Sequence, residues 1–389
     1  PWKAFIQRGH GTTAIDSPYV GDAIVAITYT GGTTGIPKGV MITNDSMNSV
    51  ALNFKYSAAP VHDNDRFLGI IPIFAAYGMV CGTHMPLCIR TTLVPIPKFV
   101  PTELGKLVRQ FRPNHMISTP AFYELMMDSK EMKGFDLSFL VTLGSGGDTM
   151  NEGLEKKLGD FMKEHNIRYP LAQGYGMSEV SAAASFGVND IHRKGSVGIP
   201  SVMTTVGIFD PDSGEELGYN QVGEICISGP TVMLGYMDNP EETANTLKSH
   251  GDGRIWLHTG DLGHMDEDGF VYFRQRLKRM IITSGYNVYP SQLENIIDGH
   301  EKVLLSCVIG IADDYKGQRL RAYVVPAPGV HPSEALKQEL LQFCAQRIAR
   351  YAMPKEVVFR AELPKTLVGK VAYRVLEEEE LAKHKEEQV

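Results

Sequence analysis

The sequence lacks a surplus of positive charge. Its 389 residues include 38 lysines and arginines against 45 aspartates and glutamates, which gives a formal net charge of −7. A nucleic-acid-binding protein normally carries a basic excess or a basic stripe, so we expect no nucleic-acid partner. Local phosphate binding stays open, because backbone amides and single lysines are sufficient for it.

Cysteine is scarce, and the number of cysteines is odd. The chain has five: Cys81, Cys88, Cys226, Cys307 and Cys344. Cys226 and Cys307 lie in apolar, strand-like runs, and no Cys/His spacing typical of a zinc site occurs. We therefore expect all five to be reduced core residues of a cytoplasmic protein.

No uninterrupted apolar run is long enough to cross a membrane. The most apolar stretch, residues 67–89, is interrupted by Pro72, Pro86 and His84. A buried strand, a loop and a helix are therefore expected there rather than a transmembrane segment. The chain begins at Pro1 without an initiator methionine or a signal peptide, so we also expect further N-terminal sequence.

The order of the apolar segments predicts an α/β protein with two domains. In the body, residues 1–276, strands alternate with helices, which favours mostly parallel sheets. The strands are expected at 23–29, 66–73, 115–118 and 139–143, and the helices at 46–55, 103–111, 122–127 and 152–164. Residues 206–228 become β-rich with Asp/Gly turns, which predicts an appended β-subdomain.

A smaller α+β domain is expected over residues 277–389, after the basic connector 275–279. Its strands are predicted at 303–311, 321–325 and 356–359, and its helices at 333–350 and 373–385. Ser333 caps the first of these helices, and Pro354 follows its end.

A loop rich in hydrogen-bond donors follows the first strand. Residues 29–40 read YTGGTTGIPKGV, so glycines, threonines and Lys38 are packed into one segment. Glycines let backbone amides approach an anion, and threonine hydroxyls add donors. The spacing differs from that of a Walker P-loop, and such a loop can also be a plain turn. We interpret it as a phosphate-binding loop.

This loop resembles the signature loop of the adenylate-forming superfamily, which includes acyl-CoA synthetases, luciferases and peptide-synthetase adenylation domains. Further segments resemble that family's motifs in the family's order. They are QGYGMSE at 173–179, GEICISGPTVMLGYMDNPEET at 223–243, HTGDLG at 258–263, RLKRMIITSGYNVYPSQLE at 276–294 and PKTLVGK at 364–370. The resemblance covers essentially the whole chain, and the family's long segment ahead of the phosphate loop is absent. The segment at 276–294 resembles the family's hinge, and its sequence is closer to that of acyl-CoA ligases than to that of peptide-synthetase adenylation domains.

The resemblance implies roles for individual residues. The catalytic residues would be Lys370, Glu179 and Arg276. The ATP-binding residues would be Thr30, Gly31, Gly32, Thr33, Thr34, Gly35, Lys38, Gly146, Gly147, Gln173, Gly174, Tyr175, Gly176, Met177, Ser178, Asp261, Phe273, Arg276 and Lys370. Mg²⁺ would be held by Thr33 and Glu179, and Lys278 would be the hinge. CoA would be bound by Ser284, Gly285 and Tyr286, and the acyl pocket would include Phe74, Ala75, Tyr77, Gly144 and Met177.

Each role has a physical reason and a plainer alternative. Tyr175 can stack on a purine but alone could be a packed core ring. Asp261 offers two acceptors for a ribose diol but also fits a turn. Lys370 can bridge a carboxylate and an α-phosphate that repel each other. Arg276 can donate to the ribose or α-phosphate, and Glu179 can hold Mg²⁺ through oxygen.

Four positions depart from the family pattern. They are Gly31, where many members have serine, Ser178 for threonine, Ala75 for histidine, and Asp148, where many members are apolar. By the resemblance, a small residue at position 75 would enlarge or alter the entrance of the acyl tunnel, so the family pattern does not specify an aryl acid.

The resemblance implies an acid–CoA ligase that uses Mg²⁺, ATP and CoA. A fatty or other apolar carboxylic acid would become acyl-AMP and then acyl-CoA. Two alternatives stay open: an adenylating enzyme that loads a carrier protein, and a non-catalytic fragment that binds nucleotide. The sequence also leaves a homodimer open.

Overall fold

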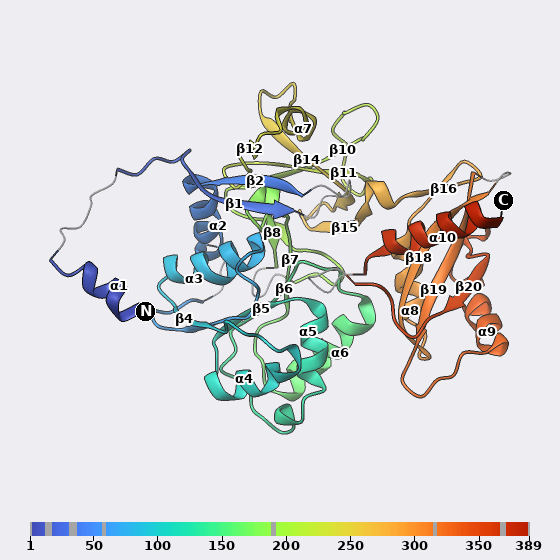
Figure 1. Ribbon diagram of the computed structural model, residues 1–389, viewed down its shortest axis with the longest axis horizontal. Helices are drawn as coiled ribbons and strands as arrows, with labels where there is room; N and C mark the ends of the chain where they lie inside the picture. The colour runs from blue at the N-terminus through green and yellow to red at the C-terminus, as the bar shows by residue number, and fades with distance from the viewer. Residues whose placement is uncertain are drawn as a thin grey trace.

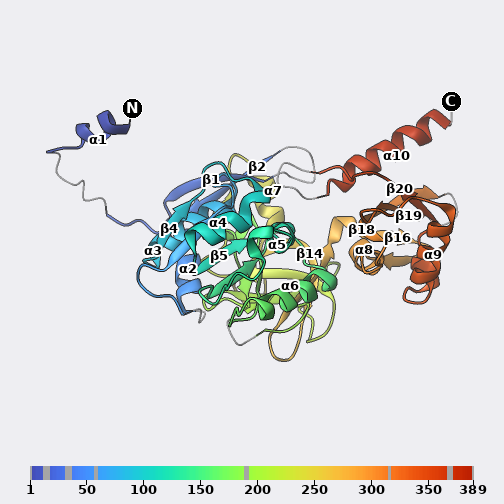
Figure 2. The same ribbon diagram turned by 90° about the horizontal axis from the view of Figure 1, so that it is seen from below.

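The computed structural model describes residues 2–11, 18–30, 37–56, 60–187, 192–313, 317–365 and 371–387. Figure 1 shows a large body and, to its right, a smaller unit that contains the C-terminal end. Helix α1 (Trp2–Arg8) lies apart from the body in both views (Figures 1 and 2). The predicted mixed α/β class is confirmed.

The body is built around a seven-stranded sheet in the order β4-β3-β5-β6-β7-β8-β9. Its strands are β3 (Arg66–Gly69), β4 (Thr92–Pro95), β5 (His115–Ser118), β6 (Thr142–Ser145), β7 (Ala172–Tyr175), β8 (Ser185–Phe186) and β9 (Ile199–Pro200). The pairings from β4 through β7 are parallel, and β8 and β9 continue the sheet antiparallel. The predicted parallel arrangement is therefore confined to this sheet.

Helices connect these strands and pack on the sheet. They are α2 (Asn44–Tyr56), α3 (Met85–Cys88), α4 (Leu104–Phe111), α5 (Pro120–Met127) and α6 (Glu152–Glu164), with a π-helix, η1 (Tyr77–His84), and 3₁₀ turns η2 (Pro101–Glu103), η3 (Lys130–Met132) and η4 (Ser178–Val180). In α6, Asn151 caps the N-terminus by accepting from the Leu154 N–H at 2.8 Å. Leu154, Leu158 and Phe161 are buried at helical spacing, so one face enters the core.

The first predicted strand is not part of the parallel sheet. It is β1 (Ile24–Thr30), and it pairs antiparallel with β2 (Lys38–Thr43), which in turn pairs with β12 (Gly235–Tyr236). Thr30 lies opposite Lys38 in the register, so the predicted phosphate-binding loop lies between the two paired strands in the sequence. Residues 31–36 of that loop lie outside the described residues.

The predicted β-subdomain is a five-stranded antiparallel sheet in the order β10-β11-β14-β13, with β15 paired to β14. Its strands are β10 (Thr205–Phe209), β11 (Gly223–Ser228), β13 (Leu247–Ser249), β14 (Ile255–Met265) and β15 (Val271–Arg276), and α7 (Pro240–Thr246) lies beside it. Strands β11 and β14 are neighbours, although their central residues are about thirty positions apart in the sequence. This pairing brings two predicted motifs together.

The C-terminal unit follows the 3₁₀ turn η5 (Leu277–Arg279). It contains β16 (Ile281–Thr283), β17 (Tyr286–Val288), α8 (Pro290–Asp298), β18 (Val303–Asp313), β19 (Gly317–Pro326), α9 (Glu334–Ala345), η6 (Arg350–Ala352), β20 (Glu356–Phe359) and α10 (Tyr373–Glu387). Its strands form one sheet in the order β17-β16-β19-β18, with β20 parallel to β19. The unit has its own apolar core, which includes Leu293, Val308 and Leu340.

The cysteine prediction is correct for four residues and wrong for one. Cys81, Cys226, Cys307 and Cys344 are buried free thiols, whereas Cys88 is exposed. Cys88 ends the short helix α3, where its side chain faces solvent and lies beside His84. Within the described residues, no helix is long and apolar enough to cross a membrane.

Candidate active site

A cleft of 1630 Å³ lies between the body and the C-terminal unit. Its walls include every predicted ATP-binding residue that the structure describes. These are Thr30, Lys38, Gly146, Gly147, Gln173, Gly174, Tyr175, Gly176, Met177, Ser178, Asp261, Phe273 and Arg276. Gly31, Gly32, Thr33, Thr34, Gly35 and Lys370 lie outside the described residues. Segments that are far apart in the sequence therefore converge on one cavity.

Tyr175 and Phe273 form an aromatic wall of the cleft. Their rings lie 6.0 Å apart with an interplanar angle of 28°. The Tyr175 hydroxyl donates to Asp261 Oδ2 at 2.7 Å, and burial followed by the Asp261 charge raises the pKa of Tyr175. Gly176 is required by sterics, because a Cβ there would lie 2.0 Å from the Ala182 carbonyl oxygen. The motif holds the tyrosine ring in one orientation.

Asp261 is the buried acceptor at this end of the cleft. Only 4% of its surface is exposed, and it lies directly opposite Arg276 in the pairing of β14 with β15. Arg276 Nε lies 3.5 Å from Asp261 Oδ1, and the arginine side chain is 48% exposed. A buried carboxylate between a tyrosine hydroxyl and a guanidinium can also accept a hydrogen bond from a sugar hydroxyl.

The stretch of β14 that precedes Asp261 is held in place by a second buried carboxylate. Glu224 Oε1 accepts from the Gly260 N–H at 2.8 Å, and Gly260 has a φ of +68°. Thr259 Oγ1 donates to the Ile225 carbonyl and accepts from the Asp261 N–H. Burial alone would raise the pKa of Glu224, but its bonds to His258 and Gly260 lower it overall. These hydrogen bonds fix the backbone that presents Asp261.

Glu179 is a third buried carboxylate on the cleft wall. It is 6% exposed, and its Oε1 accepts from the Tyr236 hydroxyl at 2.8 Å. Burial and the neighbouring Glu179 raise the pKa of Tyr236, so this hydroxyl stays a donor. Carboxylate oxygens are suitable Mg²⁺ ligands, and Glu179 fits its predicted role in that respect.

Lys38 has a carboxylate partner that the sequence did not reveal. Its ammonium forms an ion pair with Glu242 on α7 and lies 4.5 Å from the centre of the Tyr236 ring. The hydrogen bond from Lys38 lowers the pKa of Glu242. Tyr236, Glu242 and Lys38 all line the cleft. The contact depends on the position of α7 relative to the β1–β2 hairpin, and no local sequence pattern predicts that position.

Four of the five predicted acyl-pocket residues line the cleft: Ala75, Tyr77, Gly144 and Met177. The fifth, Phe74, is 71% exposed and is not among the residues that line the cleft. The glycine-rich turn lies directly against Tyr77: a Cβ on Gly146 would be 3.4 Å from its hydroxyl, an ordinary van der Waals contact. Apolar side chains extend this part of the cavity: Val50, Phe54, Ile71, Cys81, Met85 and Phe186.

The C-terminal unit closes the cleft with residues from α8, β18 and the start of α10. Ser291 Oγ donates to the Arg274 carbonyl of the body at 2.7 Å. Val371, which follows Lys370 in sequence, lines the cleft, as does the predicted hinge Lys278. Ser284, Gly285 and Tyr286 do not line it. Ser284 and Gly285 form an exposed turn between β16 and β17. Tyr286 is the first residue of β17, and its exposed ring stacks on Tyr351 with ring centres 4.5 Å apart.

Two arginines near the hinge belong to different parts of the molecule. Arg276 pairs with Asp261 of the body. Arg279 pairs with Glu294 of α8 at 2.5 Å, and its guanidinium lies over the Tyr373 ring. The side-chain contacts of the chain therefore change from the body to the C-terminal unit across residues 277–278.

Comparisons with known proteins match both parts of the chain. Residues 6–237 match the AMP-binding enzyme family, and residues 292–370 match the AMP-binding enzyme C-terminal domain. A long-chain-fatty-acid–CoA ligase of Bacillus subtilis is 36% identical over 93% of this chain, and one of Yersinia pestis is 32% identical over 98%. The chain spans 62% and 66% of the lengths of these two relatives.

Solved structures agree with this assignment. ATP-bound MatB from Rhodopseudomonas palustris superposes with a TM-score of 0.83 and 29% identity, covering 92% of this chain and 69% of that one. The o-succinylbenzoate CoA synthetase MenE of Bacillus subtilis, in complex with its acyl-adenylate, gives 0.79 and 25%, with coverage of 92% and 69%. On the family match and these identities, the chain belongs to the AMP-binding enzyme family.

Proposed function

We propose that this chain activates a carboxylic acid with ATP to form an acyl-adenylate and then transfers the acyl group to CoA. One observation carries the proposal. A single cleft combines an aromatic wall, the buried carboxylates Asp261 and Glu179, Lys38 and a small apolar wall at Gly144–Gly147. The names of the relatives, long-chain-fatty-acid–CoA ligases, support the same chemistry.

The nucleotide end of the cleft would bind ATP by shape and charge. The adenine ring packs against Tyr175, and Asp261 accepts from the ribose hydroxyls. Arg276 has a half-exposed guanidinium that can donate to the ribose or α-phosphate. Glu179, together with Thr33 from outside the described residues, would hold Mg²⁺, which supplies charge neutralisation at the phosphates.

Adenylation requires a carboxylate to approach an α-phosphate of the same charge. Lys370 would neutralise both groups and hold them in line. This lysine lies on the C-terminal side of residues 277–278, where the chain leaves the body. We infer that residues 277–389 act as a lid that pivots at Lys278. This inference is supported by the contacts of Arg276 with the body and of Arg279 with the C-terminal unit. In another lid position, Ser284, Gly285 and Tyr286 would face the CoA thiol.

The acid would occupy the apolar end of the cleft, near Tyr77 and Gly144. Apolar side chains dominate there, and burying each methylene of an acyl chain contributes about 0.8 kcal/mol. A fatty or other apolar acid is therefore the proposed substrate class.

The test is an acid screen with the 389-residue chain, Mg²⁺, ATP and CoA, read by mass spectrometry. For apolar acids of some chain length, we expect acyl-AMP to form when CoA is left out and acyl-CoA to form when CoA is added. If no acid in a panel of fatty, aryl and short polar acids yields AMP, the adenylation proposal is wrong. If the acyl group of acyl-AMP is transferred only to a phosphopantetheinylated carrier protein and not to CoA, the carrier protein is the acceptor instead of CoA.

A further inference from the structure

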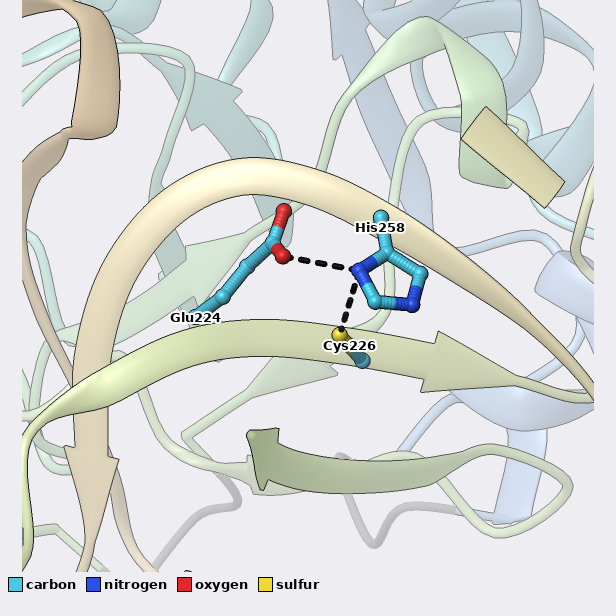
Figure 3. Close-up of side chains that lie close together, drawn as sticks. All are labelled: Glu224, Cys226 and His258. Atoms are coloured by element: carbon cyan, nitrogen blue, oxygen red, sulfur yellow. Dashed lines mark hydrogen bonds and ion pairs between the residues drawn. The ribbon is translucent and has the colours of Figure 1, made fainter. Parts of the chain in front are cut away.

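A compact group of three potential metal ligands lies in the β-subdomain, beside the nucleotide cleft. Glu224 and Cys226 are two residues apart on β11, and His258 lies opposite Cys226 on β14. His258 Nδ1 is 2.7 Å from Glu224 Oε2 and 3.6 Å from Cys226 Sγ. Figure 3 shows both groups directed at the same ring nitrogen. One ligand atom from each residue lies within 4.8 Å of the others.

The His258 ring is held in place from its far side. His250 Nε2 lies 2.9 Å from His258 Nε2, and the two imidazoles stack with centres 5.2 Å apart. Histidines that bind metals almost always use the second ring nitrogen in such a hydrogen bond, which fixes the tautomer and the ring orientation. The contact leaves Nδ1 as the nitrogen that faces the carboxylate and the thiol.

The donor set is chemically selective. A thiolate, an imidazole and a carboxylate together match the ligands of Zn²⁺ and similar borderline divalent cations, whereas Mg²⁺ prefers oxygen alone. Cys226 is fully buried, but Glu224 and His258 line the nucleotide cleft, so an ion can reach the group from there. Three protein ligands would leave the fourth tetrahedral position for water.

We propose that Glu224, Cys226 and His258 bind one Zn²⁺-class cation at the edge of the nucleotide cleft. The ion takes the place of the Cys226 thiol proton, which is released to solvent. The proton of neutral His258 moves from Nδ1 to Nε2, where it is donated to His250 Nε2, and His250 carries its own proton on Nδ1. Glu224 Oε2 becomes the metal ligand, and Oε1 keeps its hydrogen bond to the Gly260 N–H. The site is therefore joined directly to the backbone that carries Asp261.

The test is a Co²⁺ titration of the full, reduced chain, monitored by absorption. We expect one equivalent to produce tetrahedral d–d bands and a thiolate-to-cobalt charge-transfer band. Cys226→Ala should abolish the charge-transfer band. Cys88→Ser is the matched control, because Cys88 is exposed and forms another Cys–His contact, 3.3 Å from His84 Nε2. The band should survive in this variant.

A substitution outside the ligand set tests the supporting role of His250. His250→Phe should keep the charge-transfer band but weaken Co²⁺ affinity about 10- to 100-fold, as expected for loss of a hydrogen bond behind a metal ligand. The assignment is overturned if the wild-type chain shows no such band, if Cys226→Ala retains it or if Cys88→Ser loses it. Should Cys226→Ala fail to fold by circular dichroism, an unchanged Co²⁺ affinity in His250→Phe overturns it instead.

Discussion

The body and the C-terminal unit hold their predicted site residues differently. On the body side, Asp261 and Glu179 are 4% and 6% exposed, and each is fixed by a tyrosine hydroxyl. In the C-terminal unit, the predicted CoA residues lie outside the cleft at an exposed turn and the start of β17, and Tyr286 is 55% exposed. The body thus offers a preformed site, whereas the groups of the C-terminal unit depend on where that unit sits.

Arg276 and Arg279, on either side of the predicted hinge, also differ in how far their side chains are exposed. Arg276 is 48% exposed in its pair with Asp261, and Arg279 is 19% exposed in its pair with Glu294. Glu294 also accepts from the Val308 N–H, so Arg279 is anchored within the C-terminal unit. One arginine is therefore available to a ligand, and the other is structural.

The largest expected effect concerns stability. Arg279→Ala leaves Glu294 buried without its cation, so the C-terminal unit should lose about 3–5 kcal/mol of unfolding free energy. The matched Arg276→Ala removes a half-exposed cation from Asp261, which keeps its hydrogen bond from the Tyr175 hydroxyl, so this variant should lose only about 1 kcal/mol. Urea unfolding of both variants measures the difference, and equal losses would contradict the assignment of the two arginines.

The next effect concerns nucleotide affinity. Asp261→Ala removes the buried acceptor and should weaken ATP binding about 10- to 100-fold, as for loss of hydrogen bonds to a charged group. Asp268→Ala is the control, since Asp268 pairs with Arg193 and is 66% exposed. Calorimetric titration with ATP distinguishes them. Comparable losses in both variants would mean that Asp261 does not contact the nucleotide.

These predictions rest on motifs that sequence reasoning located well, because their residues are close together in the chain. The segments around Tyr175 and Asp261 were expected in one site, and they share the cleft. The strands at 115–118 and 356–359 and the helix at 152–164 match the structure to the residue. The local pattern of apolar and polar residues was sufficient for these elements.

Contacts between distant segments could not be predicted in this way. The Lys38–Glu242 pair joins residues 204 positions apart, and the His258–Glu224 contact depends on the register of β11 against β14. No Cys/His spacing reveals a group assembled across two strands. Strand β2 and the exposure of Phe74 also depend on tertiary packing rather than on local sequence.

A smaller effect is expected from the Tyr175 hydroxyl. Tyr175→Phe keeps the ring but removes the donor to Asp261, so ATP affinity should fall about 2- to 10-fold. Tyr272→Phe removes a hydroxyl that donates to Asp266 instead and should leave ATP affinity unchanged. A Tyr175→Phe affinity equal to that of the wild type would show that orientation of Asp261 by this hydroxyl is unimportant.

The smallest effect concerns Lys38. In Glu242→Gln, Lys38 no longer has to leave an anionic partner, so ATP affinity at neutral pH should rise by about fivefold at most. Lys38 lowers the pKa of Glu242 below its ordinary value of 4.5, so the carboxylate is charged above that value. The gain over wild type should vanish as the pH falls through the lowered pKa. A gain that is independent of pH would contradict this explanation.

The most direct test separates the two half-reactions. Lys370→Ala should slow acyl-AMP formation by about a hundredfold or more but convert supplied acyl-AMP and CoA to thioester at a near-normal rate. Lys278→Pro should do the reverse, because proline fixes φ at the hinge. Lys365→Ala and Lys278→Ala serve as controls. If Lys370→Ala slows both half-reactions equally, a lid that presents different groups at each step is the wrong account of this protein.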